Sequence, residues 1–588
     1  MYYSRGNYEA FARPRKPEGV DAKSAYIIGS GLAALATAAF LIRDGQMAGT
    51  RIHILEELEI AGGACDGIDD PQKGLVIRGG REMEDHFECL WDLFHSIPSL
   101  EIEGASVLDE FYWLNKKDPN FTKMRAIAHR GKDAGLDFKF GLSDAAILEI
   151  SKLFLASDEE LYDVKINEVF SDEVLKSNYW LYWRTMFAFE EWHSALEMRR
   201  YIQRFIHHIG GMPDFSALKF TTFNQYESLI LPLVSYLEKN GVEFSYGTRV
   251  RDVVFDIKQQ TKTATQLICE QAGAKLIIDL SDDDLLFITN GSCTESSSLG
   301  DNDNPPRLIE GGGCWDLWRN IAAQDASFGR PEKFCEDVEA SKWESATVSV
   351  TSDEIIKRVS EISGREVFTG GVVTGGIVTV QDSSWLLSYS VSRQPHFKAQ
   401  PKGTMVVWLY GLFPDATGDF VKKPMQECTG QELVQEWLYH LGIEEDRIVK
   451  MAREGTSCIP CMLPYITAFF MPRAAGDRPL VVPEGSSNFA FIGQFTETER
   501  DTVFTTEYSV RTAMESVYTL LGVDRGVPET FGSTFDVRYL LDASVKLKDG
   551  EKLSDMQLPL VLGLLERQAL KVLQGTLLEE LLKKYGAI

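Results

Sequence analysis

The sequence predicts an α/β fold: a split Rossmann-like domain, an α+β region inserted into it, and a helical C-terminal segment. Three observations predict this fold. A glycine-rich turn stands between a short apolar strand and an alanine-rich helix near the N-terminus. Strand-like segments ending in small residues recur far along the chain, and the last of them precedes an amphipathic helix near residue 510. The chain of 588 residues is long enough for two or three domains.

The N-terminal motif is the clearest of these signals. Residues 25–28 form the expected strand, and residues 29–34 read GSGLAA, a G-x-G-x-x-A turn. The first glycine permits the tight turn, the second lets a pyrophosphate approach the helix N-terminus, and Ala34 is small enough for close packing of helix and strand. A second strand ends at Glu56, where an acid is expected to bind a ribose hydroxyl, with Glu57 as the alternative.

The later segments favour FAD over NAD as the nucleotide. A helix, a turn and a strand lie within residues 228–256, a buried strand ends at residues 290–291, and a further strand ends at Gly493 before a helix. Large flavoproteins are commonly built with such a late return of the last strand and helix, around long insertions. The expected FAD-binding domain comprises residues 20–115, 210–298 and 480–525, and the expected substrate-binding region comprises residues 116–209 and 299–479.

Composition argues against several classes of protein. The formal net charge of −27 argues against a general nucleic-acid binder. The first twenty residues lack the apolar core of a signal peptide and no stretch has the length of a membrane span, so we expect a cytoplasmic protein. Nine cysteines, an odd number, indicate reduced thiols, and packing is the favoured role of the one C-x-x-C at residues 458–461. We predict no metal site, because the histidines lack ligand spacing and the adjacent His207 and His208 should point apart on a helix.

A second glycine pair precedes a charged pair in "RGGREMEDHFECLW", residues 78–91. Gly79 and Gly80 let the backbone approach another group closely. Arg81 and Glu82 then form either a plain surface salt bridge or a charged pair held against a bound ligand. The residues alone leave both interpretations open.

Seven blocks, in order between about residues 2 and 520, resemble the oleate hydratases, once called myosin-cross-reactive antigens. The blocks are "NYEAFARPRKPEGVD", "YIIGSGLAALA", "RGGREMEDHFECLWDLF", "NQYESLILPL", "RQPHF", "CMLPYITAFFMPR" and "FIGQFTETERDTVFTTEYSVR". The resemblance implies an FAD-binding enzyme that adds water across the cis double bond of unsaturated fatty acids, converting oleate to 10-hydroxystearate without net redox. It also implies a homodimer at the membrane surface. Reduced flavin is expected to work better than oxidised flavin.

The resemblance assigns the water-activating carboxylate to Glu82 and the proton donor to Tyr201, in "EMRRYIQRF". Hydration of an isolated alkene needs an acid and a base on opposite sides of the bond, in a site that excludes other water. Because a tyrosine is a poor acid in water, the developing carbocation must be stabilised nearby, and Glu82 and the flavin ring are the candidates. Gly79 and Gly80 would let the loop lie against the flavin, with Arg81 and Glu82 toward the substrate.

The family's carboxylate-binding segment commonly reads Thr-x-Asn-Arg-Gln-Pro-His, and here residues 390–396 read SVSRQPH. A serine can replace threonine as a hydroxyl donor, but Ser392 lacks the amide donor of asparagine, so chain-length preference can differ. His396 is either a ligand or a buried histidine satisfied by backbone. The substrate-binding candidates are Arg81, Ser390, Ser392, Gln394 and His396. The cofactor-binding candidates are Gly29, Ser30, Gly31, Ala34, Glu56, Gly79, Gly80, Asn290, Gly291, Ser292 and Gly493.

Residues 530–588 are expected to form a helical segment in which Leu570, Leu573, Leu577, Leu581 and Lys584 lie three or four residues apart. Such a leucine face suits either a membrane interface or packing in a core or dimer, and the resemblance favours the inner face of the membrane. Two rival functions stay open. One is an FAD-dependent amine oxidase or desaturase-type oxidoreductase, and the other is a fatty-acid-binding protein without catalysis.

Overall fold

The structure is a computed structural model that describes residues 8–551 except 66, 71, 72, 81 and 500, together with residue 575 and residues 577–585. Three residues singled out above, Arg81, Leu570 and Leu573, lie outside the described residues.

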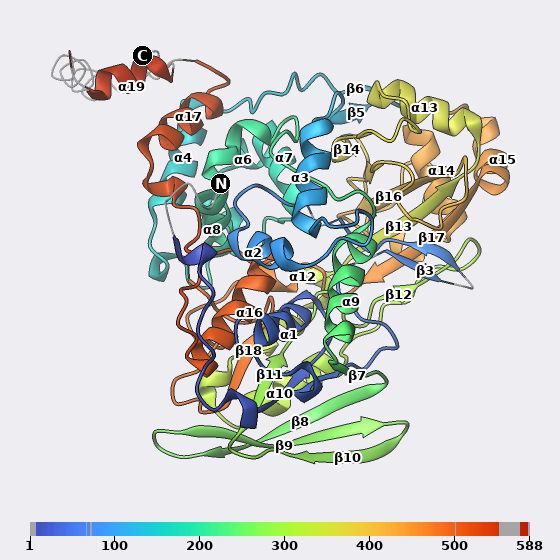
Figure 1. The fold of residues 1–588 in the computed structure, drawn as a ribbon. Coiled ribbons are helices and arrows are strands. Elements are labelled where there is room, and N and C mark those ends of the chain that lie inside the picture. The colour runs from blue at the N-terminus through green and yellow to red at the C-terminus, as the bar shows by residue number, and fades with distance from the viewer. Residues whose placement is uncertain are drawn as a thin grey trace.

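A five-stranded parallel sheet carries the N-terminal motif (Figure 1). Its order is β18-β11-β1-β2-β7, so the strands, counted along the chain, follow the Rossmann order 3-2-1-4-5. The predicted Rossmann-like α/β fold is thereby confirmed. The strands are β1 (Ser24–Ile28), β2 (Ile52–Leu55), β7 (Glu243–Ser245), β11 (Asp284–Thr289) and β18 (Phe489–Ile492).

Different elements cover the two faces of this sheet, because alternate strand residues point to opposite sides. Ala25 and Ile27 belong to one core with the helices α1 (Leu32–Arg43), α2 (Glu88–Ser96), α9 (Leu231–Lys239) and α16 (Thr506–Leu521). Ile28 and Leu55 belong to another core, with α10 (Gly313–Ala322) and an antiparallel sheet of β8 (Thr248–Ile257), β9 (Lys262–Gln271) and β10 (Ala274–Asp279). A pair, β3 (Ile68–Asp70) and β4 (Gly74–Val76), follows β2.

An eight-stranded mixed sheet of order β12-β17-β13-β16-β15-β14-β5-β6 forms the centre of the other half (Figure 1). Its strands are β5 (Ala126–Ala128), β6 (Lys132–Asp133), β12 (Ser298–Leu299), β13 (Trp343–Val350), β14 (Ile377–Val380), β15 (Ser388–Ser390), β16 (Met405–Gly411) and β17 (Thr456–Leu463). The helices α13 (Asp353–Ser363), α14 (Gly430–His440) and α15 (Glu445–Gly455) pack on one face. Cys458 and Cys461 lie buried in β17, and all nine cysteines are free thiols, which confirms both cysteine predictions.

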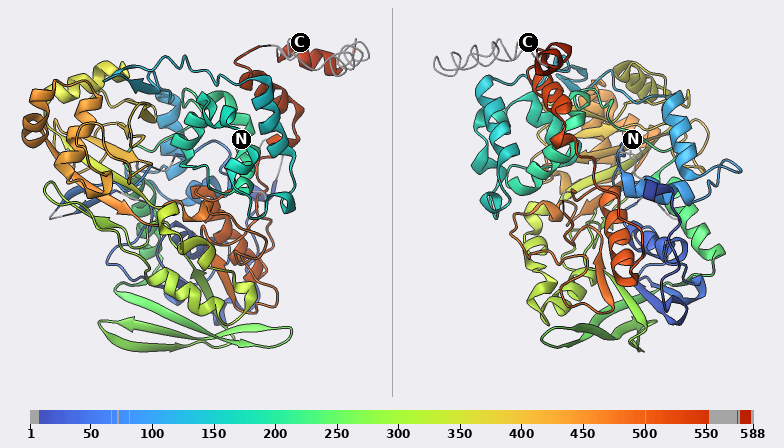
Figure 2. Two further views of the ribbon diagram at one scale, coloured as in Figure 1. Left: turned by 180° about the vertical axis from the view of Figure 1, so that it is seen from behind. Right: turned by 60° about the vertical axis from the view of Figure 1, so that its left-hand side comes forward.

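A helical group packs beside this second sheet and ends the chain (Figure 2). It contains α4 (Asp144–Leu155), α5 (Ile166–Val169), α6 (Asp172–Leu175), α7 (Asn178–Phe187), α8 (Ala195–Phe205), the 3-10 turn η6 (Ile206–Gly211), α11 (Glu332–Cys335), α12 (Val338–Ser341) and α17 (Val537–Leu547), and α19 (Leu577–Lys584) follows α17 in the chain. The helix α3 (Val107–Lys117) packs instead against α2, in the core of the first sheet. The predicted C-terminal helices exist in α17, which packs against η6, and in the peripheral α19. No helix among the described residues is long and apolar enough to cross a membrane.

Candidate functional site

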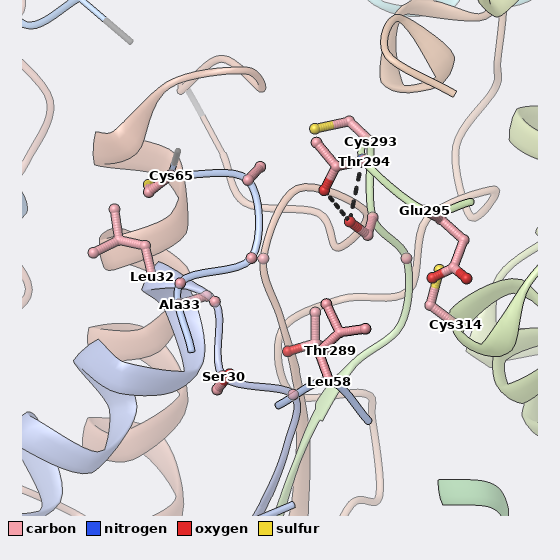
Figure 3. A pocket seen from close by; sticks show the side chains of 18 of the residues that line it. Ser30, Leu32, Ala33, Leu58, Cys65, Thr289, Cys293, Thr294, Glu295 and Cys314 are labelled. Atoms are coloured by element: carbon pink, nitrogen blue, oxygen red, sulfur yellow. Dashed lines mark hydrogen bonds between the residues drawn. The ribbon is translucent and has the colours of Figure 1, made fainter. Parts of the chain in front are cut away.

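A cavity of about 570 Å³ opens where β1, β2 and β11 end (Figure 3). We call it the dinucleotide cavity. It lies at the switch point between β1 and β11, where open parallel sheets bind ligands. Most of the predicted cofactor residues line it: Gly29, Ser30, Gly31, Glu56, Gly291, Ser292 and Gly493.

The turn before α1 is held by hydrogen bonds at the edge of this cavity. Gly29 has a φ of +87°, and a Cβ there would lie 3.4 Å from the Thr289 hydroxyl oxygen. The backbone N–H and the hydroxyl of Ser30 donate to one Glu56 oxygen, at 2.8 and 2.6 Å, and the N–H of Leu58 donates to the other at 2.8 Å. Glu56 therefore connects the turn to the strand end while it faces the cavity.

Two predicted cofactor residues support the dinucleotide cavity without lining it. Ala34 is fully buried in α1, and the Asn290 side-chain amide donates to the carbonyl of Phe495 at 2.9 Å. The structure adds Gly62 and Gly63, which line the cavity with φ values of +119° and +57°. A Cβ on Gly63 would lie 3.0 Å from the α-carbon of Gly31, so the two backbones need glycine to meet. The sequence signal that we overlooked was the AGGA of residues 61–64.

Three smaller cavities, of about 40, 60 and 30 Å³, all border Gly80 and Glu82, and we call them the Glu82 cavities. The first is also lined by Gly79, Ser390, Ser392 and His396, and the second by Tyr201. The structure therefore gathers around one carboxylate the residues of three segments, namely the loop at Glu82 itself, the segment of Tyr201 and the 390–396 segment.

The Glu82 carboxylate lies over the α-carbon of Gly80, because a Cβ there would be 3.2 Å from Glu82 Oε1. Glu82 is half-buried, and its negative charge raises the pKa of the buried Tyr410, for which burial is the larger cause. This position beside cavities favours the ligand-facing interpretation of Glu82 over that of a surface salt bridge.

Tyr201 lies on α8 and is 1 % exposed. Its phenol donates to the carbonyl of Val503 at 2.6 Å. The rings of Phe187 and Phe205 lie 5.1 and 5.6 Å from the tyrosine ring, so an aromatic wall surrounds it. Phe504 borders the cavity of Tyr201 and the dinucleotide cavity alike, which makes the two neighbours.

The residues of the 390–396 segment have two different positions: some line a cavity, and Gln394 holds the segment to a strand. Ser390, Ser392 and His396 border the first Glu82 cavity, and burial lowers the pKa of His396 to about 4, so its imidazole is neutral at pH 7. Gln394 instead bonds the backbone of Val406 in both directions, at 3.0 and 3.2 Å, and attaches the segment to β16. Nothing in the sequence distinguished its role from that of its neighbours.

The prediction that His207 and His208 point apart was wrong. Both imidazoles reach Glu84 Oε2, with Nε2 distances of 3.7 and 3.1 Å, and their ring centroids lie 4.1 Å apart. The prediction failed because Glu84 comes from the separate loop before α2 and lies within reach of both rings. Arg204 Nη1 is 3.4 Å from Glu84 Oε1, and the His86 N–H donates to Oε2 at 2.6 Å. A guanidinium at that distance disfavours a metal cation.

A second group of potential ligands in the described part of the chain consists of Asp419, Glu436 and His440. His440 Nε2 lies 3.4 Å from Asp419 and 3.3 Å from Glu436. The Glu436 carboxylate accepts backbone N–H bonds from residues 419–421, at 2.5, 2.9 and 2.8 Å. This carboxylate therefore fastens a loop to α14, and the expected absence of metal stays a prediction.

The family model and the two relatives found by sequence agree on one family. A model of the MCRA family matches residues 22–518. The chain is 51 % identical over 587 residues to "Oleate hydratase" of Streptococcus pyogenes serotype M49 (strain NZ131), covering 99 % of both chains. It is 30 % identical over 560 residues to "Linoleate hydratase" of Lactiplantibacillus plantarum, covering 89 % of this chain and 98 % of that one. Among solved structures, cyclohexylamine oxidase from Brevibacterium oxydans IH-35A gives a TM-score of 0.49 at 12 % identity, over 85 % of this chain and 98 % of that one.

Proposed function

Because this chain belongs to the MCRA family, we propose that it is a hydratase that adds water across the cis double bond of unsaturated fatty acids, oleate giving 10-hydroxystearate. The observation that carries the proposal is the 51 % identity over 99 % of an oleate hydratase. The reaction has no net redox change, since a proton and a hydroxide add to the two alkene carbons.

In the proposed mechanism Glu82 is the base and Tyr201 the acid. Glu82 removes a proton from water as the water oxygen bonds to one carbon, and the phenol of Tyr201 gives its proton to the other carbon. The proposal is supported by the second Glu82 cavity, which both residues border. Its apolar wall, which includes Phe187 and Phe205, keeps competing water away from the carbocation.

We propose that FAD binds in the dinucleotide cavity, whose volume suits a ligand of that class. The glycine turn of residues 29–31 would hold the pyrophosphate at the N-terminus of α1, and Glu56 would hold a ribose hydroxyl. The close approach of Gly63 to Gly31 leaves bare backbone there, which fits a phosphate cradle. FAD would supply an electron-rich ring that stabilises positive charge, and Phe504, which borders both this cavity and that of Tyr201, would stand between the two. Activity is proposed to be higher with reduced FAD than with oxidised FAD.

The fatty-acid carboxylate is proposed to bind Ser390, Ser392 and His396. These residues border the first Glu82 cavity, whereas Tyr201 borders the second, and Gly80 and Glu82 border both. The proposed carboxylate site and the reacting bond therefore lie in neighbouring cavities. Two hydroxyls and an imidazole offer hydrogen bonds to a carboxylate. Gln394 is proposed to act by holding the segment in place.

The C-terminal segment, residues 530–588, is proposed to bind the inner face of the membrane, where its substrate partitions. The proposal is supported by the leucine spacing of the sequence and by the peripheral position of α19. Flotation with liposomes of the full chain and of a chain truncated near residue 560 tests it, and equal binding of both would refute it. We propose in addition that the protein is a homodimer, which sedimentation tests.

We also propose that the domain division predicted from the sequence is correct, which limited proteolysis tests.

The experiment that tests the function is incubation of the purified protein with oleate, FAD and a reductant in oxygen-18 water. Mass spectrometry should detect a hydroxy acid that carries the heavy oxygen. Light oxygen in the product would identify an oxygenase, and bound but unchanged oleate would identify a binding protein.

A further inference from the structure

The group of Glu84, His207 and His208 lies beside the proposed reaction site but takes no part in the mechanism above. Glu84 and His208 line the same cavity of about 60 Å³ as Glu82 and Tyr201. Glu84 comes from the loop before α2, whereas His208 lies on η6, directly after the helix that carries Tyr201. The carboxylate is 3 % exposed and the His208 side chain 21 % exposed.

The proposed hydration, on which this inference rests, leaves two residues in the wrong protonation state. After one turnover Tyr201 is a phenolate, because its proton is on carbon, and Glu82 is a carboxylic acid, because it holds a proton from water. The cycle closes when Glu82 loses one proton and Tyr201 regains one before the next turnover. A proton carrier in the cavity that both residues border gives the shortest route for this transfer.

We propose that His208, held on Glu84, accepts the proton that leaves Glu82 and delivers it to the Tyr201 phenolate. Histidine is the side chain best suited to exchange protons near neutral pH. Between turnovers, when no alkene occupies the cavity, it has room for a few water molecules, which can bridge gaps between the ring and its partners. Glu82, His208 and Tyr201 end the cycle as they began it, with no added reactant.

The surroundings of His208 fit a transient imidazolium. Burial alone would raise the pKa of Glu84, but the contacts of His207 and His208 and the charge of Arg204 hold it well below its usual range. Glu84 is therefore an anion that stabilises the charged ring 3.1 Å away. Burial lowers the pKa of His207 to about 4 and that of His86 to about 3, so both stay neutral.

The residues packed around η6 distinguish His208 from His207 as the proton carrier. His207 Nδ1 lies 3.0 Å from the Ser533 hydroxyl, so that ring is fixed to the C-terminal segment. The Lys546 side chain of α17 passes over Gly210, where a Cβ would lie 3.2 Å from its carbons. Arg204 is paired with Asp501 at 3.2 Å as well as with Glu84. Of the two histidines, only His208 borders the cavity.

The test compares the first turnover with later ones. His208→Ala and His208→Gln should give a first turnover at the wild-type rate, because Tyr201 starts protonated. A burst of one product per active site should follow, and then a steady rate lower by about 10-fold or more. Free imidazole should restore the steady rate of His208→Ala. KM should fall in proportion to kcat, because a step after the chemistry limits the rate, and FAD affinity should not change. The control is His95→Gln, an exposed histidine at the end of α2.

Two results overturn the inference. One is a steady rate in both His208 variants equal to that of the wild type. The other is a slowed first turnover without a burst and without imidazole rescue, which would mean a structural role. The wild-type reaction in oxygen-18 water is run beside these assays. If the wild type yields no hydroxy acid with heavy oxygen, the proposed function is wrong. If the wild type yields this product, the assays of the variants test the role of His208 alone.

Discussion

The dinucleotide cavity and the Glu82 cavities are built in different ways. The first is formed mainly by backbone turns at the ends of strands in one sheet, with Gly29, Gly31 and Gly63 at close approaches. The second group is formed by side chains that meet from the loop at Glu82, α8, the 390–396 segment and the chain near Phe504. A site built from backbone depends on glycines, whereas a site built from side chains depends on individual functional groups.

The largest expected effect is at Glu82. Glu82→Gln keeps the shape of the side chain but removes the base, so kcat should fall about 10³-fold, within the usual range for a general base. Flavin affinity, measured by titration, should stay unchanged, because Glu82 does not line the dinucleotide cavity. A variant with normal kcat would contradict the role of Glu82.

Tyr201→Phe should lower kcat about 10²-fold, since it removes the acid and leaves the ring in place. Loss of the hydrogen bond to Val503 should also lower the free energy of unfolding by about 1 kcal/mol. Tyr179→Phe is the matched control, because Tyr179 is equally buried, lies on the neighbouring α7 and borders none of the four cavities described here. Equal losses in both variants would show that the effect is packing.

Gly29→Ala should break the backbone-built site. At a φ of +87° an alanine is strained by about 1–2 kcal/mol, so FAD affinity should fall about 10-fold, with kcat recovered at saturating FAD. Gly273→Ala, in the β9–β10 turn, has a φ of +77° and open space around its Cβ. Gly273→Ala should strain the backbone by a similar amount, but Gly273 does not line the dinucleotide cavity. An equal loss of FAD affinity in Gly273→Ala would therefore show that the loss does not depend on the position of Gly29 in the cavity.

Gly80→Ala should affect chemistry and spare FAD, because Gly79 and Gly80, both predicted cofactor residues, line the Glu82 cavities and do not line the dinucleotide cavity. The new methyl would lie 3.2 Å from Glu82 Oε1 and would displace the carboxylate by a few tenths of an ångström. Because such displacements matter for proton transfer, kcat should fall about 5-fold. Titration with FAD distinguishes the two regions, because substitution of a glycine in the Glu82 cavities should leave FAD affinity unchanged. A loss of FAD affinity in Gly80→Ala would contradict this prediction.

The smallest effect is expected at His396. Its folded pKa of about 4 lies below the ordinary value near 6.5, so the unfolded chain binds the extra proton first. Stability from this site is complete above about pH 6.5 and is lost as the pH falls toward 4. His396→Gln should flatten that part of the stability curve, measured by urea unfolding, and should raise KM about 3-fold by loss of a hydrogen bond. If the variant loses more stability than the wild type as the pH falls from 6.5 to 4, the assignment of this pH dependence to His396 is wrong.

The sequence predicted the dinucleotide cavity well and the Glu82 cavities only through family resemblance. The G-x-G-x-x-A turn and Glu56 are local, and strand periodicity places them on one sheet edge. Tyr201 and His396 are nearly 200 residues apart, and no spacing rule brings them together around Glu82. The same limit explains the error at His207 and His208, because the partner that draws both rings together, Glu84, lies more than 120 residues earlier.

The burial of α1 has a consequence for synthesis of the protein. Leu32 to Leu41 are all buried, and much of their cover comes from α16, which ends at Leu521. About 480 residues separate the ends of the two helices, so at about 5–20 residues per second a ribosome leaves α1 incompletely covered for roughly 25–95 s. The parallel sheet likewise gains its edge strand β18 only after residue 492 has emerged. The first helix to be made is thus among the last to be enclosed, and chaperones that bind apolar nascent chain have an extended period in which to act.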